Sequence, residues 1–365
     1  MPVLRVEGLY KVFGRRPHEV VDQLRAGASA AEVQASGATA AVIDAAFDVE
    51  PGEIFVVMGL SGSGKSTLIR MLNGLVTPTA GHVLVGDEDV AALDPKGLRD
   101  LRQRRISMVF QHFALLPHRS VVENTAYALE VRGVDRRTRL AAAREALEMV
   151  GLEAWADHRP DELSGGMQQR VGLARALAAE TDILLMDEAF SALDPLIRRE
   201  MQDQLMELQS RLGRTIVFIT HDLNEAMRLG DRVAVMRDGR IVRLDTPEAI
   251  LADPGDEYLE RFLADVDRSR VFTAGDVMSA PVDGADGRPV ATAVTVAPDT
   301  PLADLLEPSA LSDAPLLVAD DTGEALGVVT RSDVLAALGG LSSDDLAARG
   351  GPAGADTHSL EAPRA

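Results

Sequence analysis

The hydrophobic positions of this chain fall into short continuous runs separated by longer segments with helical spacing. Apolar runs at 54–58, 183–186 and 215–220 are dominated by Val, Ile, Leu, Met and Phe. Such runs are typical of strands buried on both faces of a parallel sheet. The segments 140–150 and 167–179 repeat their apolar positions every three to four residues, which predicts helices between these strands. The alternation predicts an α/β fold.

Weaker patterns complete the first domain, which we expect to span 1–268. Alternating polarity over 3–12 predicts an edge strand, and a helical subdomain is expected at about 112–180. Further strands are predicted at 83–85, 107–110, 233–236 and 241–242. The last two flank the Asp238-Gly239 turn and read as a closing hairpin. The sheet is therefore mixed.

A helix-like insertion interrupts the sheet at about 17–40. Ser29 and Glu32 have the spacing of a capping box, and Gly37 is a stop signal. The sheet is expected to resume at Val42. Nothing in its composition assigns the insertion a role, and a solvated helical segment is the simplest interpretation.

The composition of the chain changes after Val271, where clusters of Gly, Pro and Asp separate short predicted elements. Thr300 and Pro301 predict a capped helix start with proline in the first helical position. A hairpin at 315–318 and 326–330 and a helix at 332–338 follow. These elements predict a small α+β domain at 271–340. The Gly/Ala/Pro/Ser-rich stretch at 341–365 is predicted to be disordered.

Composition narrows the class of protein. The chain has 365 residues, about two domains by length, and a formal net charge of −20. That charge argues against a nucleic-acid partner, because phosphates would be repelled. No apolar run approaches the roughly 20 residues of a membrane span, and the N-terminus lacks a signal-peptide pattern, so we expect a cytosolic protein. The absence of cysteine agrees with a reducing compartment.

A complete phosphate-binding loop follows the first buried run. Its residues are Gly59, Leu60, Ser61, Gly62, Ser63, Gly64, Lys65, Ser66 and Thr67. In this strand-loop-helix context the backbone N–H groups and the helix N-terminus face one anion. Lys65 is expected to reach the β- and γ-phosphates of ATP, and the Ser66 hydroxyl to ligate Mg²⁺. The alternative, a glycine-rich surface turn, explains this context poorly.

Further polar residues follow buried strands and point to the same chemistry. They are Gln111, Asp187 with Glu188, and His221. Because the carboxyl ends of parallel strands form one edge, these residues should converge with Gly59 on one site. Asp187 suits coordination of Mg²⁺, and Glu188 suits orienting or deprotonating the attacking water. Gln111 is expected to contact metal and water, and His221 to hydrogen-bond the γ-phosphate.

A second anion-binding helix end is predicted at Leu163-Ser164-Gly165-Gly166-Met167-Gln168. Ser164 has the properties of an N-cap, and two consecutive glycines expose backbone N–H groups. A capped structural helix is the alternative, but glycine in a first turn weakens helix nucleation and calls for another reason.

Together these motifs resemble the ATP-binding subunits of ABC transporters over about residues 1–265. The resemblance implies a head-to-tail homodimer in which Ser164, Gly165, Gly166 and Gln168 of one subunit close on ATP held by Lys65 of the other. It places Asp194 at the dimer seam. It also implies that Phe13, or else Tyr10, stacks on adenine. Met167 departs from the commonest signature, which has glutamine there.

A narrower resemblance is to the glycine betaine/proline branch of importers for quaternary amines and other compatible solutes. It rests on Val109-Phe110-Gln111 followed by Phe113-Ala114-Leu115-Leu116-Pro117-His118, and on Glu188-Ala189-Phe190-Ser191. The resemblance implies an energy-coupling ATPase peripheral to the cytoplasmic face of the membrane. Membrane permease subunits would dock near the Gln111 loop. An extracytoplasmic substrate-binding protein would take part indirectly.

The C-terminal unit resembles one CBS domain, and Thr330-Arg331-Ser332-Asp333 resembles its ligand-loop pattern. Thr330 and Asp333 would then contact an adenine-nucleotide ligand. Such domains usually work in pairs, and here there is room for one, so dimerisation without a ligand is an equal alternative.

Other functions stay open at this point. The site chemistry does not separate a compatible-solute importer from an importer of another small solute, such as an amino acid. A soluble, non-transport ABC ATPase is disfavoured because the chain has neither a second ATPase module nor a long coiled-coil insertion. An adenine-nucleotide sensor with a degenerate ATPase is disfavoured by the intact Lys65, Asp187, Glu188 and His221.

Overall fold

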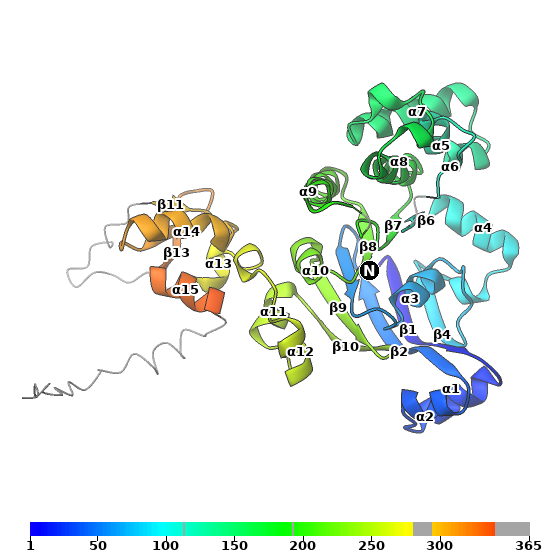
Figure 1. Cartoon of the computed structure of the whole chain (residues 1–365), viewed down its shortest axis with the longest axis horizontal. Coiled ribbons are helices and arrows are strands. Elements are labelled where there is room, and N and C mark those ends of the chain that lie inside the picture. Colours follow the sequence, from blue (N-terminus) through cyan, green and yellow to red (C-terminus); the bar gives the residue numbers. More distant parts are fainter. Residues whose placement is uncertain (112–113, 192, 280–293, 340–365) are drawn as a thin grey trace, which may run out of the picture. The chain divides into compact units, whose positions relative to one another are not determined.

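The computed structural model describes residues 1–111, 114–191, 193–279 and 294–339 (Figure 1). The chain divides into two compact units. The first comprises 1–250 and 255–260, and the second comprises 251–254 and the described residues from 261 onward. Within the described residues, no helix is long and apolar enough to cross a membrane. The predicted tail at 341–365 lies outside the described residues.

A six-stranded sheet forms the centre of the first unit, in the order β10-β9-β3-β8-β7-β6. Its strands are β3 (Ile54–Met58), β6 (Ile106–Val109), β7 (Ile183–Asp187), β8 (Thr215–Thr220), β9 (Arg232–Arg237) and β10 (Arg240–Asp245). All neighbouring pairs are parallel except β10 with β9. Every residue of β3, β7 and β8 is buried. The strands predicted from continuous apolar runs are confirmed, as is the closing hairpin.

A four-stranded antiparallel sheet, β2-β1-β4-β5, packs against this centre. Its strands are β1 (Leu4–Phe13), β2 (Thr39–Val49), β4 (Ala80–Val85) and β5 (Glu88–Asp89). The rings of Phe47 and Phe55 stack at 4.7 Å between the sheets. Strand β2 begins before the predicted Val42, because Thr39 and Ala40 pair with the last residues of β1. The mixed architecture is confirmed.

The insertion forms two short helices, α1 (Pro17–Arg25) and α2 (Ala30–Ala35). The predicted capping box is present: the Ser29 hydroxyl accepts from the Glu32 N–H, and the Glu32 carboxylate accepts from the Ser29 N–H at 2.7 Å. The insertion is not wholly solvated. Its inner face buries Val20 and Val33 in a small core with Tyr10 of β1.

The remaining helices of the first unit flank the sheets or build the helical subdomain. Those beside the sheets are α3 (Lys65–Leu72), α4 (Pro95–Arg104), α9 (Pro195–Leu212) and α10 (Leu223–Leu229). Two further helices, α11 (Pro247–Ala252) and α12 (Glu257–Phe262), follow β10, and the boundary between the two units falls within each of them. The subdomain contains α5 (Val121–Thr125), α6 (Tyr127–Val131), α7 (Arg136–Met149) and α8 (Gly165–Ala178). These four gather together in Figure 1, and α8 packs on α5, α6 and α7.

The second unit has a three-stranded sheet, β11-β12-β13, with helices around it. Its elements are α13 (Ala274–Val277), β11 (Thr295–Val296), α14 (Leu302–Leu311), β12 (Leu316–Ala319), β13 (Ala325–Val329) and α15 (Arg331–Gly339). The predicted hairpin, β12 with β13, is confirmed. Pro301 stands at the N-cap of α14 with extended backbone, not at the first helical position as expected. Leu302, Leu305 and Val318 are at the centre of this core.

Candidate nucleotide site

The phosphate loop joins β3 to α3, and its three glycines have positive φ angles that side chains rarely adopt. Gly59 and Gly64 have φ angles of 150° and 106°. A Cβ at Gly59 would lie 2.2 Å from the Met236 carbonyl oxygen, and one at Gly64 would lie 2.1 Å from that of Ala41. A side chain at either position would therefore displace backbone, which explains the glycines.

Lys65 is directed back into the loop. Its side chain is only 4% exposed, and Nζ donates to the carbonyl oxygens of Gly59 at 2.7 Å and Leu60 at 3.1 Å. Burial lowers the pKa of Lys65, and the negative charges of Glu188 and Asp187 partly oppose this. Among the described residues, nothing hydrogen-bonds the buried Ser63 hydroxyl. A buried ammonium and an unpaired hydroxyl in one glycine cradle fit a polyphosphate.

The strand ends that should converge do so. Strands β3, β8, β7 and β6 are neighbours and parallel, so the residues after them share one edge of the sheet. The Glu188 carboxylate is the meeting point. Its Oε2 accepts from Gln111 Nε2 at 3.3 Å and lies 3.2 Å from His221 Nδ1. The structure thus brings the predicted base, the histidine and the glutamine into contact.

Asp187 lies at the end of β7 beside the phosphate loop. It is 3% exposed, and the Ser66 hydroxyl donates to its Oδ1 at 3.1 Å. Burial raises the pKa of Asp187, while the Ser66 hydrogen bond and the charge of Arg70 oppose the rise. A hydroxyl beside a carboxylate is a hard-oxygen donor set that suits Mg²⁺ completed by water and phosphate oxygens.

Glu188 has an unusual backbone for a residue with a side chain, with φ at 46°. Such left-handed conformations cost on the order of 1–3 kcal/mol and persist only when neighbours enforce them. The Glu188 N–H donates to the Ile219 carbonyl at 2.9 Å, and the Ser191 hydroxyl donates to the Glu188 carbonyl at 2.9 Å. These bonds direct the carboxylate out of the sheet toward His221.

The second predicted anion site is at the start of α8. Ser164 is its N-cap and accepts from the Met167 N–H at 3.3 Å. A cavity of about 560 Å³ lies here, lined by Ser164, Gly165, Gly166, Met167, Arg170, Leu193, Asp194 and Ile197. Ser164 and Asp194 thus share one cavity. Gln168 does not line it, because its amide donates to the Leu163 carbonyl at 3.1 Å.

The two aromatic residues that could stack on adenine, Tyr10 and Phe13, differ in solvent exposure. Tyr10 is 5% exposed, and the guanidinium of Arg25 from the insertion lies 5.2 Å from its ring centre. Phe13, at the end of β1, is 46% exposed, with Lys11 Nζ 5.0 Å from its ring centre. A ring buried under the insertion cannot receive a base on its face, so the geometry favours Phe13.

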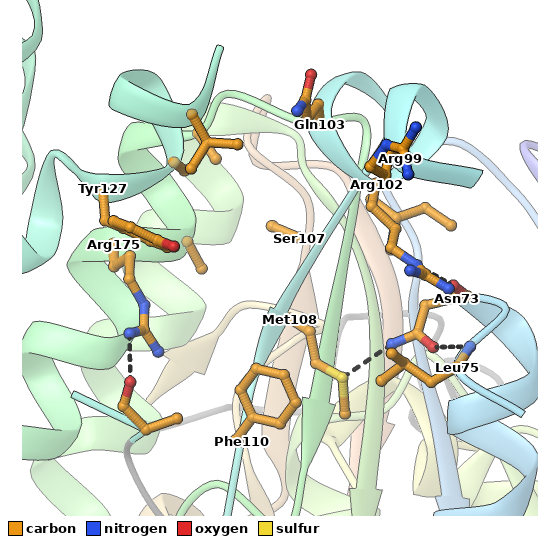
Figure 2. A pocket seen from close by; sticks show the side chains of 16 residues that line it. Asn73, Leu75, Arg99, Arg102, Gln103, Ser107, Met108, Phe110, Tyr127 and Arg175 are labelled. Carbon is orange, nitrogen blue, oxygen red and sulfur yellow. Dashed lines mark hydrogen bonds between the residues drawn. The ribbon is translucent and has the colours of Figure 1, made fainter. Parts of the chain in front are cut away.

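A groove of about 470 Å³ lies between the sheet and the helical subdomain (Figure 2). It is lined by Asn73, Leu75, Arg99, Arg102, Gln103, Ile106, Ser107, Met108, Phe110, Ala114, Tyr127, Ala128, Val131, Arg175, Ala176 and Ala179. Figure 2 shows Arg99 and Arg102 of α4 on one side and Tyr127 with Arg175 on the other. Phe110, next to Gln111, is in its floor. Arg102 is fixed by bonds to the Asn73 and Gly74 carbonyls, each at 2.8 Å.

Thr330 and Asp333 of the second unit form hydrogen bonds with each other at the start of α15. The Thr330 N–H and hydroxyl donate to Asp333 Oδ2 at 2.9 and 2.7 Å, and the Asp333 N–H donates to the Thr330 hydroxyl at 3.2 Å. This reciprocal arrangement is a capping box. It gives both residues a structural role, and their contact with a ligand stays a prediction.

Arg70 is a site residue that the motifs did not reveal. Its guanidinium lies 3.9 Å from Asp187 Oδ2, on the face of α3 next to β7. Met236 is another, since its carbonyl crowds Gly59. Neither has a sequence signal of its own, because each acts through a contact between distant segments.

The fold and this edge of the sheet define the class: a P-loop nucleoside triphosphatase. Residues 42–191 match the family model of the ABC transporter, and residues 274–340 match that of the CBS domain. The chain belongs to the ATP-binding subunits of ABC transporters, and it is an ATPase of that family.

Several curated proteins are similar to it. The glycine betaine/carnitine transport ATP-binding protein GbuA of Listeria monocytogenes is 44% identical over 391 residues, covering 93% of this chain and 98% of that protein. The glycine betaine transport ATP-binding protein OpuAA of Bacillus subtilis is 55% identical over 276 residues, 75% of this chain and 66% of that protein. The glycine betaine/proline betaine transport system ATP-binding protein ProV of Escherichia coli is 52% identical over 275 residues, which cover 75% of this chain and 69% of that protein.

Solved structures support the same assignment. The dimeric ATP-binding cassette MJ0796 superimposes with a TM-score of 0.57 and 31% identity, over 67% of this chain and 98% of that one. A post-hydrolysis dimer of the same cassette, bound to ADP and phosphate, matches with a TM-score of 0.56 and 32% identity over the same shares of the two chains.

Proposed function

We propose that this chain is the energy-coupling ATPase of a membrane importer for glycine betaine, proline betaine or related quaternary-amine compatible solutes. The similar proteins GbuA, OpuAA and ProV are named for transport of these compounds. The contact network at Glu188 supports the ATPase half of the proposal. The solute is chosen by the permease and the binding protein. The identity of the solute is therefore supported only by the names of the similar proteins.

ATP hydrolysis would use the residues at the sheet edge in distinct roles. Lys65 would exchange the Gly59 and Leu60 carbonyls for oxygens of the β- and γ-phosphates. Glu188 would orient and deprotonate the attacking water, a contribution of about 10²–10⁴ in rate. His221, 3.2 Å from Glu188, would hydrogen-bond the γ-phosphate.

Mg²⁺ fits the oxygen donors next to the loop. Ser66 and Asp187 would hold it, with Gln111 completing the protein contacts and sensing the γ-phosphate. The bound ion would neutralise charge on the phosphates. Asp187 is already aligned by the Ser66 hydroxyl at 3.1 Å.

A second copy of the chain would complete the site. Among the described residues, the cavity at Ser164 is lined by none of the phosphate loop. Ser164, Gly165 and Gly166 of one subunit would therefore close on ATP held by Lys65 of its partner, with Asp194 at the seam. The dimeric form of the similar cassette MJ0796 supports this arrangement.

The permease would dock in the groove beside Gln111. Its apolar floor at Met108 and Phe110, with arginines at the sides, suits an amphipathic helix that carries carboxylates. Movement of that helix would then reach Gln111 through Phe110. This assembly would hold the ATPase at the cytoplasmic face of the membrane, with the extracytoplasmic binding protein coupled only indirectly.

We further propose that the CBS unit regulates transport by pairing with its copy across the dimer. It would do so with an adenine nucleotide at Thr330 and Asp333, or without one. Truncation after Val271 tests the pairing. The proposal requires that this truncated chain show altered dimerisation or altered regulation by solute, and it fails if both are unchanged.

The decisive experiment is solute uptake. Cells that produce this chain with the permease and binding protein of its own gene cluster would be given labelled glycine betaine, choline, trimethylamine N-oxide, proline or methionine. We expect uptake of a methylated amine with wild type and none with Lys65→Ala. Uptake of methionine alone would favour an amino-acid importer. Lys65-dependent ATPase activity that the permease does not change, together with no uptake of any of these solutes, would favour a non-transport ATPase.

A further inference from the structure

The guanidinium of Arg198 connects two segments of the nucleotide site that the mechanism uses separately. Arg198 lies in the first turn of α9, just after Asp194. Its Nε and Nη2 donate to the carbonyl oxygens of Phe190 at 3.2 Å, Leu193 at 3.2 Å and Ser191 at 3.5 Å. Its Nη1 lies 3.1 Å from Asp222 Oδ2. One planar group therefore contacts both segments.

Each segment carries a functional side chain next to the atoms that Arg198 binds. The first runs from Glu188 to Asp194. The second begins with His221, whose chain neighbour is Asp222. Since His221 Nδ1 also lies 3.2 Å from Glu188 Oε2, the segments touch twice, once at their functional side chains and once through Arg198.

Asp222 is itself held rigidly, so it is a firm anchor for the guanidinium. It is the N-cap of α10, where its Oδ1 accepts from the Glu225 N–H at 3.1 Å. Its own N–H donates to the Thr220 hydroxyl at 2.9 Å. The other carboxylate oxygen, Oδ2, faces Arg198. A shift of Phe190, Ser191 or Leu193 would therefore strain the bonds on both sides of the guanidinium.

We propose that Arg198 is a positioning residue for ATP hydrolysis, which fixes the segment that carries Glu188 and Asp194 against the segment that carries His221. The inference rests on the proposed role of Glu188. Only arginine can make all of these contacts. Its planar guanidinium carries several N–H donors that point in different directions, toward three carbonyl oxygens and one carboxylate. A lysine could keep the contact with Asp222 but not the carbonyl bonds.

The test uses the full-length protein and measures steady-state ATPase activity, binding of a fluorescent ATP analogue and thermal stability. Arg198→Lys and Arg198→Gln should each lower kcat by about tenfold or more, since misplacement of catalytic groups by ~1 Å is costly. The KM for ATP and the affinity for the analogue should change by less than about twofold, because the hydrogen bonds of Arg198 go to 190–193 and Asp222 and not to the phosphate loop. Arg211→Lys is the matched control on the same helix. Arg211 pairs with Glu207 at 3.8 Å and should be replaceable without effect.

A double-mutant cycle with Asp222→Asn sharpens the test, because asparagine retains the cap of α10 but loses the charge that faces Arg198. We expect the effects of Arg198→Gln and Asp222→Asn on kcat to be strongly non-additive. Wild-type kcat in Arg198→Lys, additive effects in the cycle, or loss of analogue binding with a large fall in Tm would each overturn the proposal. Glu188→Gln is measured in parallel. If that variant keeps full activity, the role of Glu188 fails, whatever Arg198 does.

Discussion

His221 Nδ1 lies 3.2 Å from Glu188 Oε2, at the ends of the neighbouring parallel strands β8 and β7. The same oxygen accepts from Gln111 Nε2 at 3.3 Å, at the end of β6. Three strands thus each contribute one polar side chain to one contact. A carboxylate held from two sides keeps its orientation, which is what a group that positions a water molecule requires.

Replacement of Glu188 by glutamine tests this arrangement. The variant keeps the shape of the side chain but cannot accept a proton, so kcat should fall by about 10²–10⁴. ATP should still bind, and the ATP-bound dimer should accumulate because it is not reset by hydrolysis. Phosphate release and light scattering in the presence of ATP measure the two effects. Glu207→Gln, on the exposed face of α9, is the control, and equal activity of the two variants would contradict the assignment.

Glu225 makes stability depend on pH in a specific direction. Burial raises its pKa above 4.5, against hydrogen bonds from Thr220 and from Gln202 Nε2 at 3.1 Å. The native state then binds the proton more tightly than the unfolded chain does. The buried charge therefore costs stability above the raised pKa, and this cost disappears as the pH falls through the raised pKa toward 4.5.

Glu225→Gln should accordingly raise the melting temperature at pH 7, because an uncharged amide removes that cost and its oxygen still accepts from Gln202. A gain of 1 kcal/mol corresponds to about 2–4 °C for a domain of this size. The difference between variant and wild type should narrow in acid. Thermal melts from pH 7.5 down to 5 check this, and a difference that widens in acid would reverse the sign of the proposed shift.

A substitution at Gly165 can test closure of the dimer without disturbing the folding of the subunit. A Cβ built there meets nothing within 4 Å, and an acidic residue in the first turn of α8 is favourable for the helix dipole. Gly165→Glu should therefore fold and bind ATP normally as a monomer. Its carboxylate would face the phosphates held by the partner, so ATP-driven dimerisation and hydrolysis should both be lost. Arg137→Glu, in the first turn of α7, is the control helix end and should dimerise like wild type.

The stacking role of Phe13 is tested by its truncation. Phe13→Ala should weaken ATP binding by about 5- to 150-fold, since stacking of a base on an aromatic ring contributes about 1–3 kcal/mol. Binding of inorganic tripolyphosphate, measured by competition, should be unchanged because it has no base. Equal weakening of both ligands would show that the substitution disturbs the phosphate loop instead.

Much of this site can be predicted from the sequence because it depends on local rules. Buried parallel strands have a clear apolar pattern, and the residue after each strand must lie at the carboxyl edge of the sheet. Gly59, Gln111, Glu188 and His221 are therefore brought together by strand order alone. The capping box at Ser29 is equally local, since its partners are three residues apart.

The rest depends on contacts that no local pattern encodes. Arg198 and Arg70 are charged residues on helices, and the same charge pattern fits a solvated face. The earlier start of β2 is set by the length of β1, its partner in the sheet. Gln168 follows the signature glycines in sequence, but the helical turn directs its amide to the Leu163 carbonyl.

The groove beside Gln111 gives a test of coupling that leaves hydrolysis intact. Val131 is half exposed in the apolar lining of the groove, and it lies in α6 of the helical subdomain, not in the phosphate loop or at the strand ends. Val131→Asp would bury a carboxylate under a docked permease helix at a cost of several kcal/mol. Basal ATPase activity of the isolated chain should stay at the wild-type level, whereas solute uptake by the assembled transporter should fall by at least about tenfold. The control is Leu212→Asp, at the C-terminal end of α9 and outside the groove lining, which should leave both ATPase activity and uptake unchanged. Normal uptake with Val131→Asp would place the permease contact elsewhere on the surface.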